Sequence, residues 1–370
     1  MLPTQHSRII AAPALIGLFP KSIYTPSEEA RAMRFAIASA PGAYRRPLPV
    51  YLGRKKLGYV FDDHRRKRVL WRTAATGIAD IEAALANGQG WKSEFYKNNT
   101  AGAGSLTGLW YDMYPNQGNP PPPSSPYSGT ALTARAFTDA MPGCIRSGTP
   151  AGSAFKQLAH ISAQINSSST VLLFYDRCAA YDNCLFSASL QNMVNTIPSP
   201  RYVTNGDGGM QIGCESITGT GVGPVTLAAL DYINDQGSSA SVPIQTNHVS
   251  VVPSRSAFSA TYGAELVCPY CTNAAGTSGA WIELAAGDMG VQSITDITWS
   301  AADGTNTYSL FLARELAVSV IPNSATYWEA DQITGFMNYE RIHDGAYISF
   351  MEWCTQGSAA ATGRLEFVWS

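Results

Sequence analysis

The sequence predicts a mainly β protein with an antiparallel, jelly-roll-like β-sandwich body and a partly helical, extended N-terminal arm. From Leu106 onward, short strand-like runs alternate with Gly, Asn, Asp, Ser and Pro, without repeated strand–helix units; this pattern argues against a parallel α/β fold. Charged residues make up 14% of the chain, against roughly 25% in an ordinary domain. The first 75 residues carry 14 Lys plus Arg and 4 Asp plus Glu, so the net charge of -2 divides into +10 here and -12 in the remainder.

Helix signals are concentrated in the first part of the chain. Ser27, followed by Glu28 and Glu29, caps a predicted helix that ends at Pro41 and Gly42. A second predicted helix, Ile78–Ala86, is closed by Asn87-Gly88. A third short helix is expected between Phe155 and Ile165.

The arm combines a basic cluster with an apolar segment. Nine basic residues are interleaved with aromatic residues and are predicted to contact a negative partner, either nucleic acid or the acidic body of neighbouring copies: Arg45, Arg46, Arg54, Lys55, Lys56, Arg65, Arg66, Lys67 and Arg68. The segment Ile9–Phe19, "IIAAPALIGLF", is interrupted by Pro13 and is interpreted as an anchor that packs on a partner. Because no stretch reaches the ~18 apolar residues of a membrane span, no membrane partner is expected.

The remainder of the chain supplies the strands. The predicted strand-like runs are "VLLFY" at 171–175, "AELVC" at 264–268, "AWIEL" at 280–284, "ITDITW" at 294–299, "YSLFLARELAVSVI" at 308–321, "AYISFMEW" at 346–353 and "RLEFVW" at 364–369. Asn116–Gly129 contains four successive prolines and is expected to be an extended surface loop. The predicted domains are an arm over 1–105, a β-sandwich module over 106–238 and a second β module over 239–370.

The sequence offers little for catalysis or metal binding. The pair "CPYC" at Cys268–Cys271 would need a second closely spaced pair for a structural zinc site. Cys178 and Cys184 are separated by five residues and are better explained as buried thiols or a disulfide. There is no G-x-S-x-G motif, and a turn at Asp344-Gly345 accounts for His343 beside Asp344. We therefore predict no catalytic residue, no metal, no cofactor and no enzyme activity.

The decapeptide Tyr175–Cys184, "YDRCAAYDNC", is interpreted as a structural motif at the end of a strand. Arg177 is expected to bridge Asp176 or Asp182, or a carboxylate on another chain. The functional form of this interpretation is a contact between subunits, made by Tyr175, Asp176, Arg177, Tyr181 and Asp182.

Several phrases together resemble a family. "LWYDMYPNQGNPPPP", "LLFYDRCAAYDNCLFSASLQNMVNT" with "PSPRYV", "WIELAAGDMGVQSI" and "YERIHDGAYISFMEW" resemble capsid-associated virion structural proteins of tailed bacteriophages. The resemblance covers roughly Leu106–Ser370 and transfers no active-site residue. It implies a virion component present in many copies and assembled in the host cytoplasm, with copies of itself and other virion proteins as partners.

The charge distribution favours the capsid among the possible locations in the virion. A basic arm on an acidic, charge-poor β body suits a capsid shell or capsid-cementing subunit whose arm reaches neighbours or packaged DNA. The alternatives are a phage tail, neck or receptor-binding β protein, and an envelope polysaccharide hydrolase, because paired carboxylates of that enzyme type have no fixed spacing in a sequence.

Overall fold

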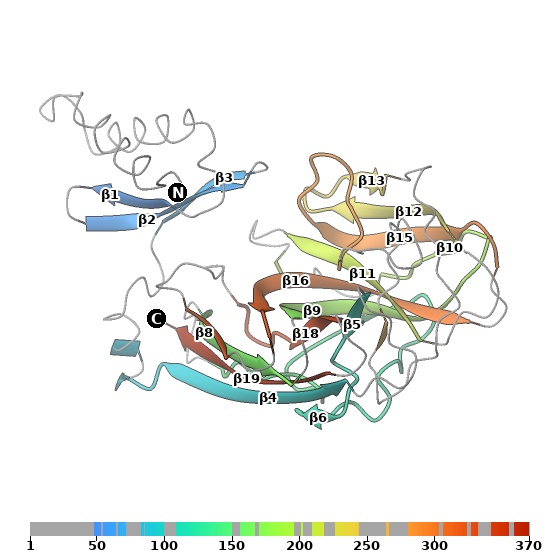
Figure 1. Ribbon diagram of the computed structural model, residues 1–370. Coiled ribbons are helices and arrows are strands. Elements are labelled where there is room, and N and C mark those ends of the chain that lie inside the picture. The colour runs from blue at the N-terminus through green and yellow to red at the C-terminus, as the bar shows by residue number, and fades with distance from the viewer. Residues whose placement is uncertain are drawn as a thin grey trace, which may run out of the picture. The chain divides into compact units, whose positions relative to one another are not determined.

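Strands dominate the computed structural model of the chain, and the prediction of a mainly β fold with antiparallel sheets is confirmed (Figure 1). The structure describes residues 48–52, 55–63, 66–71, 83–84, 86–99, 109–149, 156–166, 170–195, 201–202, 209–217, 226–243, 264–265, 280–302, 306–323, 327–331, 342–354 and 359–369. The chain divides into two compact units, Met1–Thr76 and Gly77–Ser370.

The first unit contains a three-stranded antiparallel sheet in the order β1-β2-β3. β1 spans Leu48–Leu52, β2 spans Lys55–Asp63 and β3 spans Arg66–Trp71. Their β-branched and aromatic residues favour extended backbone. The sequence predicted an extended arm here, whereas the described backbone is a β meander. The predicted helix after Ser27 and the apolar segment Ile9–Phe19 lie outside the described residues.

The second unit is built on a seven-stranded antiparallel sheet. Its main order is β11-β16-β9-β18-β5-β14, and β7 pairs with β9. The strands are β5 (Leu109–Asp112), β7 (Ala134–Ala136), β9 (Thr170–Leu185), β11 (Met210–Ser216), β14 (Ala264–Glu265), β16 (Thr307–Ile321) and β18 (Ile348–Cys354).

Two smaller antiparallel sheets complete the unit. The five-stranded sheet has the order β17-β8-β19-β4-β6 and the four-stranded sheet has the order β10-β15-β12-β13. Their strands are β4 (Gly90–Asn99), β6 (Gly118–Asn119), β8 (Lys156–Ile165), β10 (Gln191–Asn192), β12 (Leu227–Asn234), β13 (Ser239–Ser241), β15 (Val291–Trp299), β17 (Trp328–Asp331) and β19 (Ala359–Trp369).

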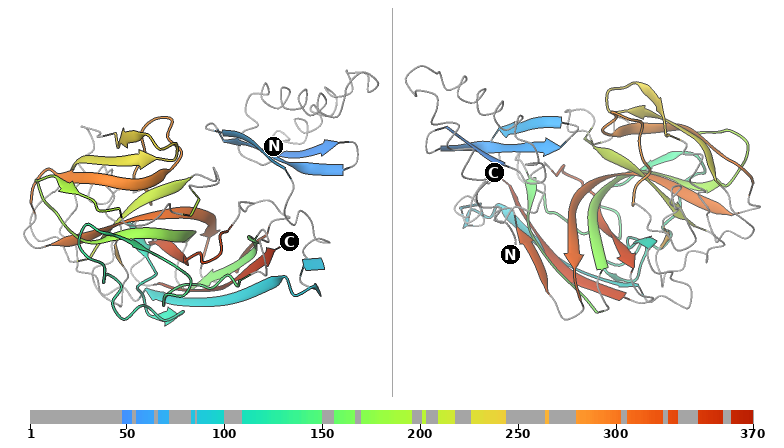
Figure 2. Two further views of the ribbon diagram at one scale, coloured as in Figure 1. Left: turned by 180° about the vertical axis from the view of Figure 1, so that it is seen from behind. Right: turned by 45° about the horizontal axis from the view of Figure 1, so that its top comes forward.

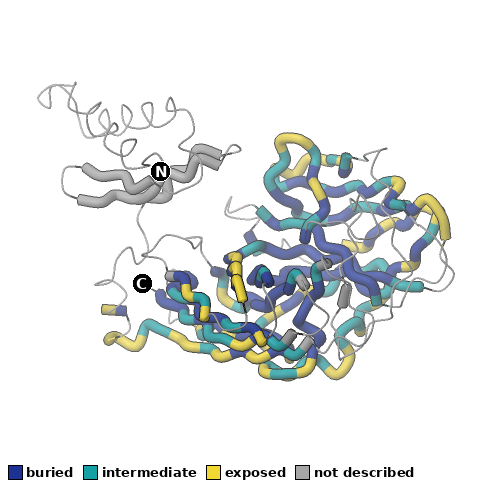
Figure 3. The backbone as a smooth tube through the Cα atoms, in the orientation of Figure 1, coloured by how far each residue is buried: buried dark blue, intermediate teal, exposed yellow. Residues whose placement is uncertain are grey.

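The length of β9 and β16 explains how one sheet supports both others. Their 16 and 15 residues correspond to about 50 Å each at the usual rise of a strand. The first half of β9, with Leu172 and Phe174, packs in one core with residues of β4, β8 and β19. The second half, with Tyr181 and Cys184, packs in another core with residues of β12 and β15. Figures 1 and 2 show the seven-stranded sheet between the other two, and Figure 3 shows its central strands buried.

The compact units do not coincide with the predicted domain boundaries at 105/106 and 238/239. β4, from the predicted arm, pairs with β19 along its whole length. β15, β16, β18 and β19, from the predicted second module, pair with β12, β9 and β8 of the predicted first module. Because these backbone hydrogen bonds join all three predicted parts, residues Gly77–Ser370 form one compact unit.

The third predicted helix is a strand. Residues Lys156–Ile165 form β8, which pairs with β17 on one side and β19 on the other. Residues 159–165, AHISAQI, alternate strictly between apolar and polar residues, which is the pattern of a strand. The prediction of a helix overlooked this alternation, and pairing with β17 and β19 holds the segment as a strand.

Two features predicted from turn residues are confirmed by the structure. The end of the second predicted helix is confirmed, because Asn87 N donates to Ala83 O at 3.0 Å and Gly88 has φ +70°. Asp344 and Gly345 form the expected turn. The run 280–284 makes only a bridge between Ile282 and Ile212. Among the described residues, no helix has the length and apolar character needed to cross a membrane.

Candidate functional site: the polar interior around strand β9

The decapeptide Tyr175–Cys184 lies within β9, not at its end. β9 continues to Leu185, pairs with β16 along its length, and pairs with β18 and β7 on its other side. All the decapeptide's residues except Asn183 are buried. The charged side chains of this central strand must therefore find partners inside the protein.

The first cluster is an ion pair centred on Arg177. Its Nη1 lies 2.7 Å from Asp112 Oδ2, its Nη2 contacts Glu215 Oε1, and all three side chains are fully buried. Asp112 Oδ1 also accepts hydrogen bonds from the Tyr175 hydroxyl at 2.5 Å and from Tyr114 N at 3.0 Å. Both oxygens of Asp112 are thus satisfied, which offsets the cost of burying its charge.

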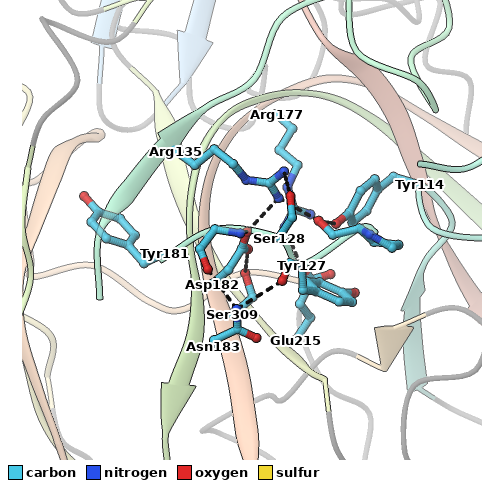
Figure 4. Close-up of polar contacts among 12 residues, drawn as sticks. Tyr114, Tyr127, Ser128, Arg135, Arg177, Tyr181, Asp182, Asn183, Glu215 and Ser309 are labelled. Atoms are coloured by element: carbon cyan, nitrogen blue, oxygen red, sulfur yellow. Dashed lines mark hydrogen bonds and ion pairs between the residues drawn. The ribbon is translucent and has the colours of Figure 1, made fainter. Parts of the chain in front are cut away.

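Aromatic rings enclose the Arg177 guanidinium. Its Cζ lies 4.4 Å from the ring centre of Tyr114, 4.9 Å from that of Phe137 and 4.3 Å from that of Phe311. These rings keep water away and contribute cation–π attraction. Figure 4 shows Arg177 close to Tyr114 in this interior.

Glu215 is the less satisfied carboxyl of the cluster. Its Oε2 finds no hydrogen-bond partner among the described residues. Burial, reinforced by the nearby Asp112 carboxylate and opposed by Arg177, raises the pKa of Glu215 to about 8. Of the two carboxyls that face the guanidinium, Glu215 has the poorer hydrogen bonding, and fewer hydrogen bonds to the charged form leave the pKa of a carboxyl higher.

The second cluster surrounds Asp176. Arg201 binds it with two nitrogens, Nη2 to Oδ1 at 2.6 Å and Nε to Oδ2 at 3.1 Å. The Tyr202 hydroxyl donates to Oδ2 and Tyr347 N donates to Oδ1, both at 2.8 Å. Arg201 Nη1 donates to Phe137 O at 2.7 Å. This cluster fastens Arg201, Tyr202 and the turn before β18 to β9.

The third cluster surrounds Asp182 and is drawn in Figure 4. Arg135 Nη2 lies 2.7 Å from its Oδ2, the Ser309 hydroxyl donates to Oδ1 at 3.0 Å, and Gly129 N donates to Oδ2 at 3.1 Å. A Cβ at Gly129 would lie 2.7 Å from this carboxylate oxygen. The end of the proline-rich loop is therefore held against β9, and a glycine permits the close approach.

Four cysteines are buried, unpaired thiols. Cys144, Cys178, Cys184 and Cys214 are free and buried, which confirms the buried-thiol alternative for Cys178 and Cys184. Burial raises the pKa of Cys144 and of Cys184 to about 12. Within the described part of the chain, no group of three His, Cys, Asp or Glu could hold a metal ion. Cys268 and Cys271 lie outside the described residues.

The structure contradicts a role for the predicted residues in contacts between subunits. Tyr175, Asp176, Arg177, Tyr181 and Asp182 are each at most 1% exposed, so their side chains present no surface to another chain. The expected partners of Arg177 were also wrong, because Asp176 pairs with Arg201 and Asp182 pairs with Arg135. The motif is structural, as interpreted, but it lies within a central strand and binds loops to that strand.

The predicted basic contact residues lie outside the second unit. Lys55 and Lys56 fall in β2, and Arg66, Lys67 and Arg68 fall in β3. Arg45, Arg46, Arg54 and Arg65 lie outside the described residues. The β2–β3 register pairs Asp62 with Lys67 and Asp63 with Arg66, so two of the basic residues have an acidic residue as register partner.

Sequence reasoning missed four members of the interior: Asp112, Arg135, Arg201 and Glu215. A usable signal was present for Glu215, an acidic residue within the apolar run "MQIGCES" that forms β11. A charge inside an apolar strand is expected to be paired. No local pattern indicated which of the Arg residues would be its partner.

Comparisons with known proteins do not identify a family for the chain. No protein-family model matches the chain and no curated protein matches it. Among solved structures, the chain is similar to that of "Crystal structure of infectious bursal disease virus VP2 subviral particle", with 11% identity, a TM-score of 0.15, and coverage of 75% of this chain and 80% of that chain. At this TM-score the two chains do not share a demonstrated fold.

Proposed function

We propose that the chain is a structural protein of a bacteriophage virion, specifically a capsid shell or capsid-cementing subunit held by contacts between copies. The observation that carries the proposal is the division of polar and apolar groups in the second unit. Ion pairs are buried around β9, while large apolar side chains are 37–58% exposed: Trp91, Tyr96, Leu185, Leu190, Val194, Val318, Val320 and Tyr327. Surface charge keeps free monomers apart, whereas a charge-poor surface with exposed apolar groups suits association.

We propose no catalytic role for the buried charged residues of the second unit. A catalytic acid or base must come within hydrogen-bond reach of a substrate, and Asp112, Arg177 and Glu215 are fully buried. Their partners are backbone and side-chain groups of the same chain. The clusters instead hold loops on a rigid sheet, as a subunit of a large assembly requires.

The N-terminal unit supplies the second part of the proposal. With a net charge of +10 over residues 1–75, against -12 for the remainder, it is suited to a negative partner, either neighbouring copies or packaged DNA. The proposed location is the virion, after assembly in the host cytoplasm.

Self-association of the purified chain tests the proposal. We expect symmetric oligomers in sedimentation velocity and negative-stain microscopy. Deleting residues 1–76 should weaken assembly while the β signal of the second unit persists. A chain that stays monomeric at high concentration would overturn the proposal. In the intact phage, immunogold labelling of the tail tip rather than the head would favour the receptor-binding alternative.

A further inference from the structure

The four-stranded sheet β10-β15-β12-β13 has an inner and an outer face of different chemistry. Leu230 and Ile297 are register partners and are fully buried in the core. Successive residues of a strand lie on opposite faces, so Asp231 and Asp296 lie on the outer face. The four strands contain no Lys or Arg.

Two like charges meet in the middle of this outer face. Asp231 of β12 and Asp296 of β15 are register partners, and their row continues to Ser241 of β13 and Asn192 of β10. Burial, together with the neighbouring Asp231 carboxylate, raises the pKa of Asp296. Neither carboxylate forms an ion pair with any described residue. Like charges directly opposite one another destabilise a sheet, and a cation from outside would remove that cost.

The surroundings of the row suit contact with another chain. Outward residues near the row are uncharged, so no fixed charge opposes a basic partner: Ala229, Ile233, Ser239, Ser241, Ser293 and Thr298. Leu190 and Val194, on either side of β10, are 58% and 50% exposed. The face therefore combines an acidic centre with an apolar edge, which is the composition of a docking surface for a basic and partly apolar segment.

The chain itself carries such a segment. Residues 202–313 contain nine acidic residues and a single basic one, Arg255, and no lysine follows Lys156. The β2–β3 segment, Lys55–Trp71, has the opposite character: its two strands contain five Lys or Arg and two Asp, together with aromatic and aliphatic residues. Acidic and basic charge are thus concentrated in different parts of the sequence, and the β2–β3 segment has the charge that complements the acidic row.

We propose that the outer face of the β10-β15-β12-β13 sheet is the docking surface for the basic β2–β3 segment of a second copy of this chain. Asp231 and Asp296 accept hydrogen bonds from Lys and Arg side chains of the incoming segment, and Leu190 and Val194 pack at the edge of the contact. This inference rests on the proposed function, because it names the surface through which copies hold one another.

Neutralising the acidic row in the full chain is the first test. We expect Asp231→Asn with Asp296→Asn to lower the association constant about tenfold, the contribution of two surface ion pairs, and to flatten its salt dependence. The matched control is Glu94→Gln with Glu329→Gln on the five-stranded sheet, which removes the same charge from a different face. Removing like-charge repulsion should leave the melting temperature of the Asn variant unchanged or higher, so weaker association reports the contact and not unfolding.

Exchanging the charges of the two proposed surfaces tests whether these surfaces contact each other. Asp231→Lys with Asp296→Lys, and Arg66→Glu with Arg68→Glu, should each abolish association measured by sedimentation velocity. The chain carrying all four substitutions should associate again, because the opposite charges still meet.

The outcomes separate the inference from the proposed function. If the wild-type chain assembles and the Asn variant assembles equally well, this docking surface is wrong while the proposed function stands. If Arg66→Glu with Arg68→Glu abolishes binding to a DNA duplex but not self-association, the β2–β3 segment serves nucleic acid and the inference is overturned. If the wild-type chain does not assemble at all, the proposed function itself fails.

Discussion

Gly213 of β11 lies directly opposite Phe311 of β16, and the phenyl ring occupies the space that a side chain at residue 213 would need. A Cβ at Gly213 would lie 2.1 Å from Phe311 Cζ. The same ring lies 4.3 Å from Arg177 Cζ. Glycine at this position therefore lets Phe311 cover the buried Arg177 guanidinium.

The first prediction concerns this contact. Gly213→Ala should lower the free energy of unfolding by about 1–3 kcal/mol, because overpacking forces the ring or the backbone to shift. Urea denaturation of the second unit measures the change. Combining Gly213→Ala with Phe311→Leu should cost less than the sum of the two single changes, since leucine lacks the ring atoms that clash. Full additivity would show that the ring does not lie over Gly213.

The second prediction separates the members of the Arg177 cluster. Arg177→Met should cost about 3–5 kcal/mol, because it leaves Asp112 as a buried, unpaired charge. Glu215→Gln should cost much less at neutral pH, because the amide resembles the protonated carboxyl that the raised pKa of Glu215 favours. Chemical denaturation of both variants checks this order. A cost of Glu215→Gln equal to that of Arg177→Met would show that Glu215 is ionised.

The third prediction is a pH dependence. The pKa of Glu215 rises from 4.5 to about 8 in the folded chain, so between these values the folded chain binds more protons than the unfolded chain. The contribution of Glu215 to stability is therefore complete below 4.5 and is lost as pH rises to about 8. Its slope is at most about 1.4 kcal/mol per pH unit.

Comparison with Glu215→Gln isolates this contribution, because the variant lacks the titrating group. The difference in unfolding free energy between wild type and variant should decrease from about pH 5 to about pH 8. A difference that stays flat or increases over this range would refute the assignment.

The fourth prediction concerns the cysteines. Four of the seven thiols are free and buried, and a thiol reacts as its thiolate. At most three thiols per chain should therefore react with Ellman's reagent in the native state, and further thiols should react on addition of denaturant. Mass spectrometry after alkylation should find Cys144, Cys178, Cys184 and Cys214 unmodified in the native chain. Rapid modification of any of these four would contradict their burial.

The sequence alone determined the features that depend on local chemistry. Strand-like runs identified β15, β16, β18 and β19 because β-branched and aromatic residues recur between turn residues. The turn at Asp344-Gly345 and the end of the helical segment at Asn87-Gly88 followed from the backbone preferences of these residues. The separation of basic and acidic charge also needed no structure.

Only the tertiary structure decided which charges meet. Arg177 is next to Asp176 in sequence, yet it pairs with Asp112 and Glu215, which are 65 and 38 residues away. Neighbouring residues of a strand lie on opposite faces, so a charge finds its partner on an adjacent strand and not beside it in sequence. The order and register of those strands depend on pairings between distant segments, and a local pattern does not carry that information.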